Sequence, residues 1–284
     1  MRGGLEATGE RLVEEHYHSS IEDYVVYLMH VATYRFAEPF ARGRRVLDYG
    51  CGSGYGSRRI AEVASAVHAV DVDEAAVDHA RRHFVRANLT YSRVEKGAPL
   101  PFPDGAFDTV LSFQVLEHVP ADVAHLAEAR RVIRPGGCLV LATPDRERRL
   151  LPLQKPWNRW HVREYSERTL RRALAGHFDD VEVLRMSGRR DVVDVELRRC
   201  RRLKWLTLPV TLPFVPDPLR VWLLGALRAL QAARGRPTVR REFDFDESVI
   251  QIGPALQPSL NLVATARVPE ARLSRARGGE ESAL

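Results

Sequence analysis

The chain contains few cysteines, and their positions argue against a thiol-based function. Only three occur among its 284 residues, Cys51, Cys138 and Cys200. Their wide spacing forms neither the paired motifs of zinc sites nor an evident disulfide framework. Cys51 lies in a glycine-rich segment where small residues are needed, so packing explains it better than nucleophilic chemistry.

Long apolar runs are also missing. No uninterrupted apolar stretch approaches the roughly 20 residues of a membrane-spanning helix, and residues 1–10 lack the apolar region of a secretion signal. We therefore expect a cytoplasmic protein. With 45% hydrophobic and 28% charged residues, the composition is that of an ordinary globular chain. Its length suits one large domain with additions better than two independent domains.

Acidic residues are fewer than basic ones, with 37 Asp and Glu against 43 Lys and Arg and a net charge of +6. The excess gathers in two clusters: Arg198, Arg199, Arg201, Arg202 and Lys204, then Arg234, Arg236, Arg240 and Arg241. Such clusters either attract a phosphorylated substrate, a nucleic acid or an anionic membrane, or form an ordinary solvated surface. No DNA- or RNA-binding motif accompanies them, so no nucleic acid partner is expected.

Apolar runs alternate with amphipathic stretches along the chain, which predicts βαβ units, a mostly parallel sheet and the α/β fold class. Strands are expected near residues 45–49, 67–71, 89–94, 107–112, 137–143, 181–186 and 259–268. Helices are expected near residues 20–40, 56–64, 74–86, 122–134 and 167–176.

The most informative segment is Val46-Leu-Asp-Tyr-Gly-Cys-Gly-Ser-Gly-Tyr-Gly56. An apolar run containing Asp48 precedes a loop with glycine at every second position, and a helix-compatible segment follows. Glycine tolerates positive φ and lets backbone amides approach a ligand closely, so the pattern predicts a strand, a nucleotide-type cradle and a helix. Val67-His-Ala-Val-Asp71 is a second apolar run that ends in an acid, where a ribose-binding carboxylate is expected on the next strand.

These two segments resemble the class I S-adenosylmethionine (SAM)-dependent methyltransferases. Residues 100–118 look like the turn, fourth strand and following loop of that family, and residues 126–143 look like its helix, Pro-Gly-Gly turn and fifth strand. The resemblance spans roughly residues 30–186 and resumes near residue 259. It implies a Rossmann-like, seven-stranded, mostly parallel sheet with helices on both faces and a reversed last hairpin. A Rossmann-like domain that does not bind SAM is the alternative, and it leaves the agreement of several ordered motifs unexplained.

The resemblance also implies S-adenosyl-L-methionine as the cofactor. In the family the glycine loop lies against the cofactor's amino-acid and sugar portions, and the acid that ends the second strand holds the ribose hydroxyls. The residues expected to bind it are His30, Asp48, Gly50, Cys51, Gly52, Gly54, Asp71, Val72, Ala98 and Phe113. His30 either meets the cofactor's carboxylate or is an ordinary helix-surface histidine. Relatives usually carry Gly-Asp-Ala after the third strand, whereas this chain has Val-Glu-Lys-Gly-Ala at 94–98, so either Glu95 or backbone amides would contact the adenine.

Two histidines are candidates for a general base, the role that histidine fills near neutral pH. His118 follows the fourth strand, and His161 belongs to a block that by resemblance overhangs the acceptor pocket. Either histidine could instead order its loop through a hydrogen bond. Some quinone-precursor O-methyltransferases carry Glu-x-x-Glu-His at the positions that correspond to residues 114–118, and they are thought to hold a divalent metal with this motif. Gln114 replaces the first of those acids here, so Glu117 lacks that partner and no metal is expected.

The segment 187–248 is longer than a hairpin needs and is predicted to be an insertion between the sixth and seventh strands. The prolines at positions 209, 213, 216 and 218 argue against a long helix there, with a short helix expected at 221–230. One interpretation is a cap that buries Trp205, Phe214 and Trp222 against the acceptor pocket. The other is an interfacial segment that rests on an anionic membrane. The prolines favour the cap, because Pro-broken segments make poor interfacial helices.

The expected organisation is an N-terminal helical cap (1–44), a SAM-binding core (45–186), the insertion (187–248), the final core strand (249–268) and a disordered tail (269–284). Residues 8–12, 34–37 and 158–165 and the insertion together resemble a bacterial methyltransferase-11-like group associated with polysaccharide or glycoconjugate assembly. That resemblance implies O-methylation of a sugar hydroxyl. The sugar would belong to a glycoconjugate, a nucleotide-sugar or a lipid-linked saccharide, and a phosphorylated acceptor would suit the arginine excess. Methylation of an aromatic natural product, with Trp157 and Trp160 lining the pocket, is one alternative. A non-catalytic SAM-binding partner or regulator is another. The oligomeric state stays open.

Overall fold

The computed structural model describes residues 17, 20–233 and 242–270 of the chain, and the sheet within this part has eight strands. They are β1 Arg45–Tyr49, β2 Ala66–Asp71, β3 Leu89–Arg93, β4 Phe107–Phe113, β5 Ile133–Pro144, β6 Asp179–Gly188, β7 Ile250–Gly253 and β8 Asn261–Arg267. Their order across the sheet is β3-β2-β1-β4-β5-β8-β6-β7. The first five strands pair in parallel, and β8 lies antiparallel between β5 and β6. The expected α/β, Rossmann-like fold with a reversed end is confirmed.

The expected number of seven strands is wrong by one. Residues 249–268, predicted as a single final strand, contain both β7 and β8. Pro254 follows β7 directly, and proline has no amide hydrogen for a strand ladder, so the run is interrupted there. The added strand is short and pairs only with β6, at the edge of the sheet.

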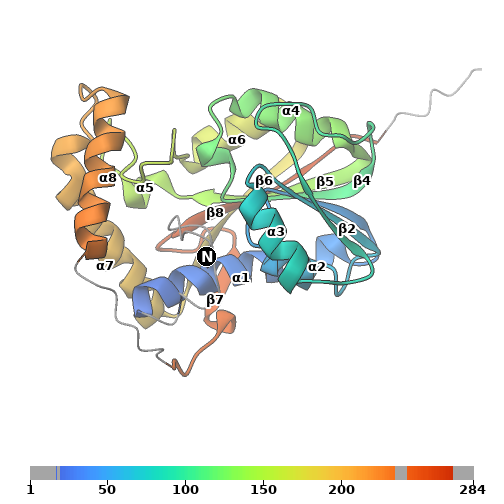
Figure 1. Ribbon diagram of the computed structural model, residues 1–284, viewed down its shortest axis with the longest axis horizontal. Helices are drawn as coiled ribbons and strands as arrows, with labels where there is room; N and C mark the ends of the chain where they lie inside the picture. Colours follow the sequence, from blue (N-terminus) through green and yellow to red (C-terminus); the bar gives the residue numbers. More distant parts are fainter. Residues whose placement is uncertain (1–16, 18–19, 234–241, 271–284) are drawn as a thin grey trace, which may run out of the picture.

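Helices cover both faces of the sheet (Figure 1). They are α1 Ile21–Ala41, α2 Tyr55–Ile60, α3 Glu74–His83, α4 Asp122–Val132, α5 Arg146–Arg149, α6 Glu167–Ala175, α7 Arg190–Thr207 and α8 Asp217–Ala233. Short 3₁₀ turns are η2 Leu116–His118, η3 Leu208–Val210 and η4 Glu247–Val249. The five helices predicted between residues 20 and 176 are present, with ends that differ by a few residues.

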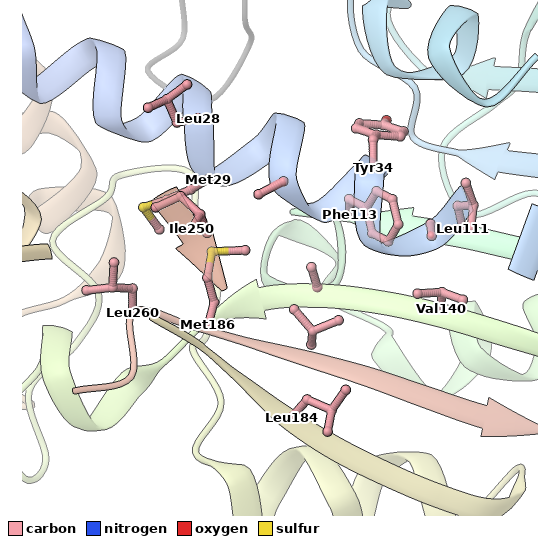
Figure 2. Packing of buried hydrophobic residues seen from close by; sticks show 14 of the residues in the cluster. Leu28, Met29, Tyr34, Leu111, Phe113, Val140, Leu184, Met186, Ile250 and Leu260 are labelled. Atoms are coloured by element: carbon pink, nitrogen blue, oxygen red, sulfur yellow. The ribbon is translucent and has the colours of Figure 1, made fainter. Parts of the chain in front are cut away.

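Two large apolar clusters hold the layers together, one on each face of the sheet, and a smaller third cluster packs α3 against β2 and β3. Side chains of α1, α2 and α7 pack on one face, and side chains of α4 and α6 pack on the other. Adjacent residues of one strand feed opposite clusters, as Val46 and Leu47 do on β1, because successive side chains of a strand point to opposite faces. Figure 2 shows Leu28 and Met29 of α1 above Met186 and Ile250 of the sheet.

The start of α1 is set by Ser20, whose side chain accepts a hydrogen bond from the amide of Asp23. Farther along, the Tyr34 hydroxyl donates to Asp48 and the Arg35 side chain donates to the backbone of Ile250. The helix therefore ties the glycine-rich end of β1 to the far edge of the sheet. Most of the predicted cap before it, including residues 8–12, lies outside the described residues.

The insertion differs from its prediction in two respects. The prolines do not prevent long helices, because the 18 residues of α7 all precede Pro209 and the 17 residues of α8 begin beside Pro218, where proline is compatible with a helix start. The expected burial of Trp205, Phe214 and Trp222 is also wrong, because all three side chains are exposed. Of the two helices, α7 contributes buried side chains to the core, including Val192 and Val193, and Phe243 and Phe245 near the end of the insertion also pack against it.

Some expectations fall outside the described residues. The second arginine cluster belongs to residues 234–241, and most of the predicted tail belongs to residues 271–284. Within the described part, no helix is both long enough and apolar enough to cross a bilayer.

Candidate active site

The predicted site residues gather at the carboxyl edge of the parallel strands. The glycine loop follows β1, Asp71 ends β2, His118 follows β4 and His161 follows β5. The chain order of the strands reverses between β1 and β4, which are neighbours in the sheet. Open α/β sheets bind ligands at such a switch point, outside the carboxyl ends of the strands.

The glycine loop is held tightly at two positions and is open at a third. Gly50, Gly52 and Gly54 have φ values of 100°, 53° and 90°, a region that favours glycine. A Cβ atom at Gly50 would lie 2.3 Å from Val115, and one at Gly54 would lie 2.5 Å from Ala80, whereas Gly52 has no atom within 4 Å of that position. The loop therefore presents the backbone around Gly52 to a ligand.

Cys51 lies within this loop and is buried. Burial raises the pKa of the Cys51 thiol well above its usual range, so the side chain is neutral. Its backbone amide donates to the carbonyl of Val70 at 3.0 Å. The structure thus gives Cys51 a packing role in the cradle, in agreement with the small residue expected there.

Asp71 organises the backbone beside the loop. One carboxylate oxygen accepts a hydrogen bond from the amide of Gly52, and the other accepts one from the amide of Asp73, both at 2.9 Å. Val72, between the two acids, is exposed at the same edge. The carboxylate thus lies against the open part of the glycine loop, where a ligand on Gly52 would meet it.

Asp48 is fully buried beneath the loop. Its carboxylate accepts the Ser57 hydroxyl at 2.6 Å and the Tyr34 hydroxyl at 3.1 Å. Burial raises the pKa of Asp48 to about 6, although both hydrogen bonds lower it. Asp48 therefore joins α1, β1 and α2 from below, and direct contact with the cofactor remains a prediction.

His30 and Phe113 flank the loop from two other elements. His30 lies three residues after Tyr27 and four before Tyr34, on one stripe of α1, and both tyrosine rings contact Tyr55, which begins α2 directly after the glycine loop. The stripe that carries His30 therefore faces the glycine loop. Phe113, the last residue of β4, is buried edge-to-face against Tyr34, with ring centroids 4.9 Å apart.

The loop after β3 lies beside Asp71, because the amide of Val94 donates to the Asp71 carbonyl at 2.9 Å. Glu95 is exposed in this turn, and the amide of Ala98 donates to the Glu95 carbonyl at 3.2 Å. The Glu95 side chain and the backbone amides, the two groups expected to contact the adenine, thus both lie at the carboxyl edge of the sheet beside Asp71. Both interpretations stay open.

The acceptor side brings together three residues from two separate loops. Ligating atoms of Glu117, His118 and His161 lie within 4.8 Å of one another, and the two imidazole rings are perpendicular with centroids 4.8 Å apart. The amide of Val162 donates to the Glu117 carbonyl at 2.8 Å, which fixes one loop against the other. Gln114, just after β4, has a φ of 56°, a strained value of the kind that gathers at functional turns.

A buried ionic chain stands behind His161. Its Nδ1 lies 2.8 Å from Oε1 of Glu164, and both carboxylate oxygens of Glu164 accept Nε of Arg149 at 3.1 Å. All three side chains are buried. Burial alone would raise the pKa of Glu164, but the Arg149 guanidinium and the His161 hydrogen bond hold it below its usual range. Glu164 is therefore an anion that orients His161.

The neighbouring histidine is oriented in a similar way. Nδ1 of His118 lies 3.1 Å from the carbonyl oxygen of Trp160. A neutral imidazole that donates from Nδ1 carries its basic lone pair on Nε2. In both histidines this tautomer makes Nε2 the basic nitrogen. Together with the Glu117 carboxylate they form a donor set that could alternatively hold a divalent cation.

Sequence reasoning found the two histidines but missed the residues that position them. Glu164 occurs in the motif around His161, three residues later, and this spacing was the available signal. Arg149 lies on α5 and gave no signal, because its contact with Glu164 exists only in the folded chain. The support of Asp48 by Tyr34 and Ser57 was missed for the same reason.

Known proteins resemble this chain over most of its length. The family described as a methyltransferase domain matches residues 47–141. A probable S-adenosylmethionine-dependent methyltransferase of Mycolicibacterium smegmatis is 30% identical over 259 residues, covering 89% of this chain and 96% of that protein. A ubiquinone biosynthesis O-methyltransferase of Thiobacillus denitrificans is 33% identical over 106 residues, covering 37% of this chain and 46% of that protein.

Among solved structures, a SAM-dependent methyltransferase of Thermotoga maritima, a possible histamine N-methyltransferase, has a TM-score of 0.56 at 14% identity. The alignment covers 92% of this chain and 97% of that one, and it shows a shared fold. The mycolicibacterial relative, matched along almost its whole length, shows the family. The chain is a member of the S-adenosylmethionine-dependent methyltransferases, and S-adenosyl-L-methionine is its cofactor.

Proposed function

We propose that this methyltransferase methylates a sugar hydroxyl of a glycoconjugate, nucleotide-sugar or lipid-linked saccharide, with His161 as the general base. The observation that carries the proposal is the buried chain from Arg149 through Glu164 to His161, which ends beside His118 at the carboxyl edge of the sheet.

The glycine loop and Asp71 fit the cofactor. The Gly52 position is open, and the Asp71 carboxylate lies beside it, as a ribose diol requires. Gly50, Gly54 and Cys51 would shape the cradle, with His30, Val72, Ala98 and Phe113 around it. When bound, the cofactor supplies a methyl group that is already activated by a sulfonium. The chain must therefore place the acceptor oxygen and remove its proton.

Proton removal is the step that needs a side chain. A hydroxyl that attacks a methyl group loses its proton, and Nε2 of His161 would accept it. The resulting imidazolium would stay paired with the ionised Glu164 carboxylate, 2.8 Å from Nδ1. A positioned base of this kind typically contributes 10²–10⁴-fold in rate. The dyad therefore favours an acceptor that must be deprotonated, such as an alcohol.

The surroundings support a sugar over an aromatic acceptor. The guanidinium groups of Arg149 and Arg199 both lie over the Trp157 ring, 4.1 Å and 5.6 Å from its centroid. The Arg159 guanidinium covers one face of Trp160. Trp157 is thus occupied by charged groups rather than lining an apolar pocket, which counts against the aromatic interpretation. The arginine excess suits a phosphorylated or diphosphate-linked acceptor, and so does the resemblance to the polysaccharide-associated group.

A non-catalytic SAM-binding role is the competing class of function. Such a protein would need the glycine loop and Asp71 but would have no use for a buried carboxylate that orients a histidine. Burying charged groups costs free energy, even when the groups are paired. A catalytic role for His161 explains why the chain buries Arg149 and Glu164 behind it.

The decisive assay supplies methyl-labelled SAM to pools of sugars, nucleotide-sugars, lipid-linked saccharides and phenols. We expect label in a saccharide pool and none in phenols. With the acceptor found, His161→Ala should lower kcat by roughly a hundredfold or more while SAM affinity stays unchanged. Added imidazole should restore part of the turnover, because a free base can occupy the vacated space.

His83→Ala is the matched control, since His83 is exposed at the end of α3. It should leave kcat unchanged. Glu164→Gln should lower kcat less than His161→Ala does. Label in phenols only would overturn the sugar assignment. Full turnover by His161→Ala would show that His161 is not the general base. SAM binding without label in any pool would support a non-catalytic protein.

A further inference from the structure

The end of α7, the connection to α8 and the outer side of α8 expose large apolar side chains. The six residues Trp205, Leu206, Phe214, Leu219, Trp222 and Leu230, here called the apolar face, have exposed fractions between 47% and 78%. Figure 1 shows α7 and α8 at one end of the molecule, away from α3 and α4. Large apolar side chains that are exposed within one short stretch of a folded chain indicate a site of interaction with a partner or a membrane.

Helical spacing places the α8 members on one side. Leu219, Trp222 and Leu230 lie on a single stripe of α8, at separations of three and eight residues. The side chains buried by the rest of the protein, Arg220 and Leu224, lie on a different side. A surface helix normally turns its polar residues outward, whereas α8 turns leucine and tryptophan outward.

Basic residues accompany the apolar ones on α7. Arg201 precedes Trp205 by four residues and Arg198 precedes it by seven, so the three side chains share one side of the helix. Arg198 and Arg201 are exposed. Arg202, four residues before Leu206, forms an ion pair with Glu22 of α1.

The charge of the whole chain is concentrated in this region. Residues 198–233, which the structure describes, contain seven of the 43 Lys and Arg residues and one of the 37 Asp and Glu residues. The segment therefore has a formal charge of +6, and the basic and acidic residues of the rest of the chain balance. The apolar face therefore belongs to a segment in which basic residues outnumber acidic ones seven to one.

This charge decides among the possible occupants. A second copy of the chain would bring one +6 segment against another, and like charges oppose such an interface. A nucleic acid would balance the charge but would leave leucine side chains against phosphates. An anionic bilayer satisfies both features, because Trp, Phe and Leu enter the headgroup region while Arg pairs with lipid phosphates.

We infer that the apolar face docks on the surface of an anionic lipid bilayer, with Trp222, Phe214 and Trp205 entering the interface and the surrounding arginines binding lipid headgroups. The inference is independent of the acceptor proposed above. It replaces the expected cap with a peripheral membrane contact for the outer half of the insertion.

The test uses the full chain and vesicles of phosphatidylcholine with or without phosphatidylglycerol. We expect sedimentation with the anionic vesicles, release as salt is raised to about 1 M, and little binding to phosphatidylcholine alone. Two of the four tryptophans belong to the apolar face. Bilayer-embedded bromolipids should therefore quench part of the tryptophan fluorescence, and Trp205→Phe with Trp222→Phe should remove that part.

Paired substitutions separate the two contributions. Phe214→Ser with Trp222→Ser should weaken vesicle binding about tenfold or more. Arg198→Gln with Arg201→Gln should weaken it by roughly 20- to 30-fold. Val85→Ser with Val123→Ser removes exposed apolar side chains near α3 and α4, and Arg82→Gln with Arg172→Gln removes exposed charges of α3 and α6; both controls should bind vesicles like the wild type. SAM affinity should be unchanged in all of them.

Several outcomes would overturn the inference. One is equal binding to neutral and anionic vesicles, and another is a loss of binding that is as large in the controls. Concentration-dependent dimers that Trp222→Ser abolishes would show that a second copy covers the face. Salt-sensitive binding to RNA or DNA in the absence of vesicle binding would assign the basic segment to nucleic acid.

Discussion

Single residues at the carboxyl edge of the sheet divide into two groups by what they contact. Asp48, Tyr34 and Ser57 are buried beneath the glycine loop and bind one another. Asp71 lies beside the open part of the loop and binds backbone amides there. The first group should therefore matter mainly for stability, and Asp71 mainly for cofactor affinity.

Asp71→Ala should leave a folded protein whose SAM affinity falls by about 1.5–3 kcal/mol, the value of a hydrogen bond to a charged group. Calorimetric titration measures this change. Asp78→Ala, which removes an acid from the surface of α3, is the control and should bind SAM normally. Unchanged affinity in Asp71→Ala would show that another group holds the ribose.

Asp48 should make stability depend on pH. Its folded pKa of about 6 exceeds the ordinary 3.8, so the native state holds the proton more tightly than the unfolded state does. The stabilisation from that proton is fully present below about pH 4 and is lost as pH rises through 6. Between pH 4 and 7 the wild type should lose roughly 2–3 kcal/mol relative to Asp48→Asn.

Urea unfolding of both proteins across this range tests the prediction. Asparagine keeps an oxygen that can accept hydrogen bonds from the Ser57 and Tyr34 hydroxyls. The comparison therefore isolates the effect of ionising Asp48. Other titrating groups cancel in the difference between the two proteins. A difference that stays constant from pH 4 to 7 would show that Asp48 titrates normally in the folded state.

At the scale of elements, the glycine loop combines a steric requirement with an open position. Gly52 and Gly54 both have positive φ, so alanine at either position costs roughly 1–2 kcal/mol. Only Gly54 would also force a Cβ against Ala80 and Tyr91, at 2.5 Å and 2.9 Å.

Gly54→Ala should therefore lower the free energy of unfolding by more than Gly52→Ala does. Gly52→Ala should instead fold and bind SAM more weakly, since its new methyl group occupies the open position. Urea unfolding and calorimetry of the two variants measure both effects. Equal stabilities, or normal SAM binding by Gly52→Ala, would contradict the assigned geometry.

Elements with strong local signals could be predicted from the sequence. The apolar runs ending at Asp48 and Asp71 and the Pro-Gly-Gly turn located β1, β2 and β5, because their periodicity and turn residues agree. The helices of the insertion and the exposure of their side chains were harder to predict from the sequence. Pro209, Pro213 and Pro216 lie between α7 and α8 and leave both helices intact, and the exposure of Trp222 depends on which side of α8 the core covers.

The candidate site could be predicted only in part for a related reason. Glycines and strand-ending acids act through their own local backbone, so the sequence pattern indicates them. The pairing of Arg149 with Glu164, and the meeting of Glu117 with His161, join loops that are distant in sequence. Such contacts arise from the order of β4 and β5 in the sheet, which no local pattern specifies.

At the scale of the whole molecule, ligand binding should appear as stability of the entire fold. A ligand that binds only the native state at 100 times its Kd adds about 2.7 kcal/mol. SAM contacts loops from β1 through β4 in the family arrangement, and the core of this chain joins those strands. SAM should therefore raise the Tm of this chain by roughly 5–10 °C.

Magnesium or manganese alone should produce no comparable shift, and turnover should survive exhaustive chelation. The reason is that a cation on Nε2 of His161 would take the lone pair that the proposed base needs. Glu117→Gln separates the possibilities, because it removes the carboxylate of the donor set and leaves the His161–Glu164 pair intact. If a divalent cation stabilises the wild type but not Glu117→Gln, and chelation abolishes turnover, the cluster is a metal site and His161 is its ligand rather than the base.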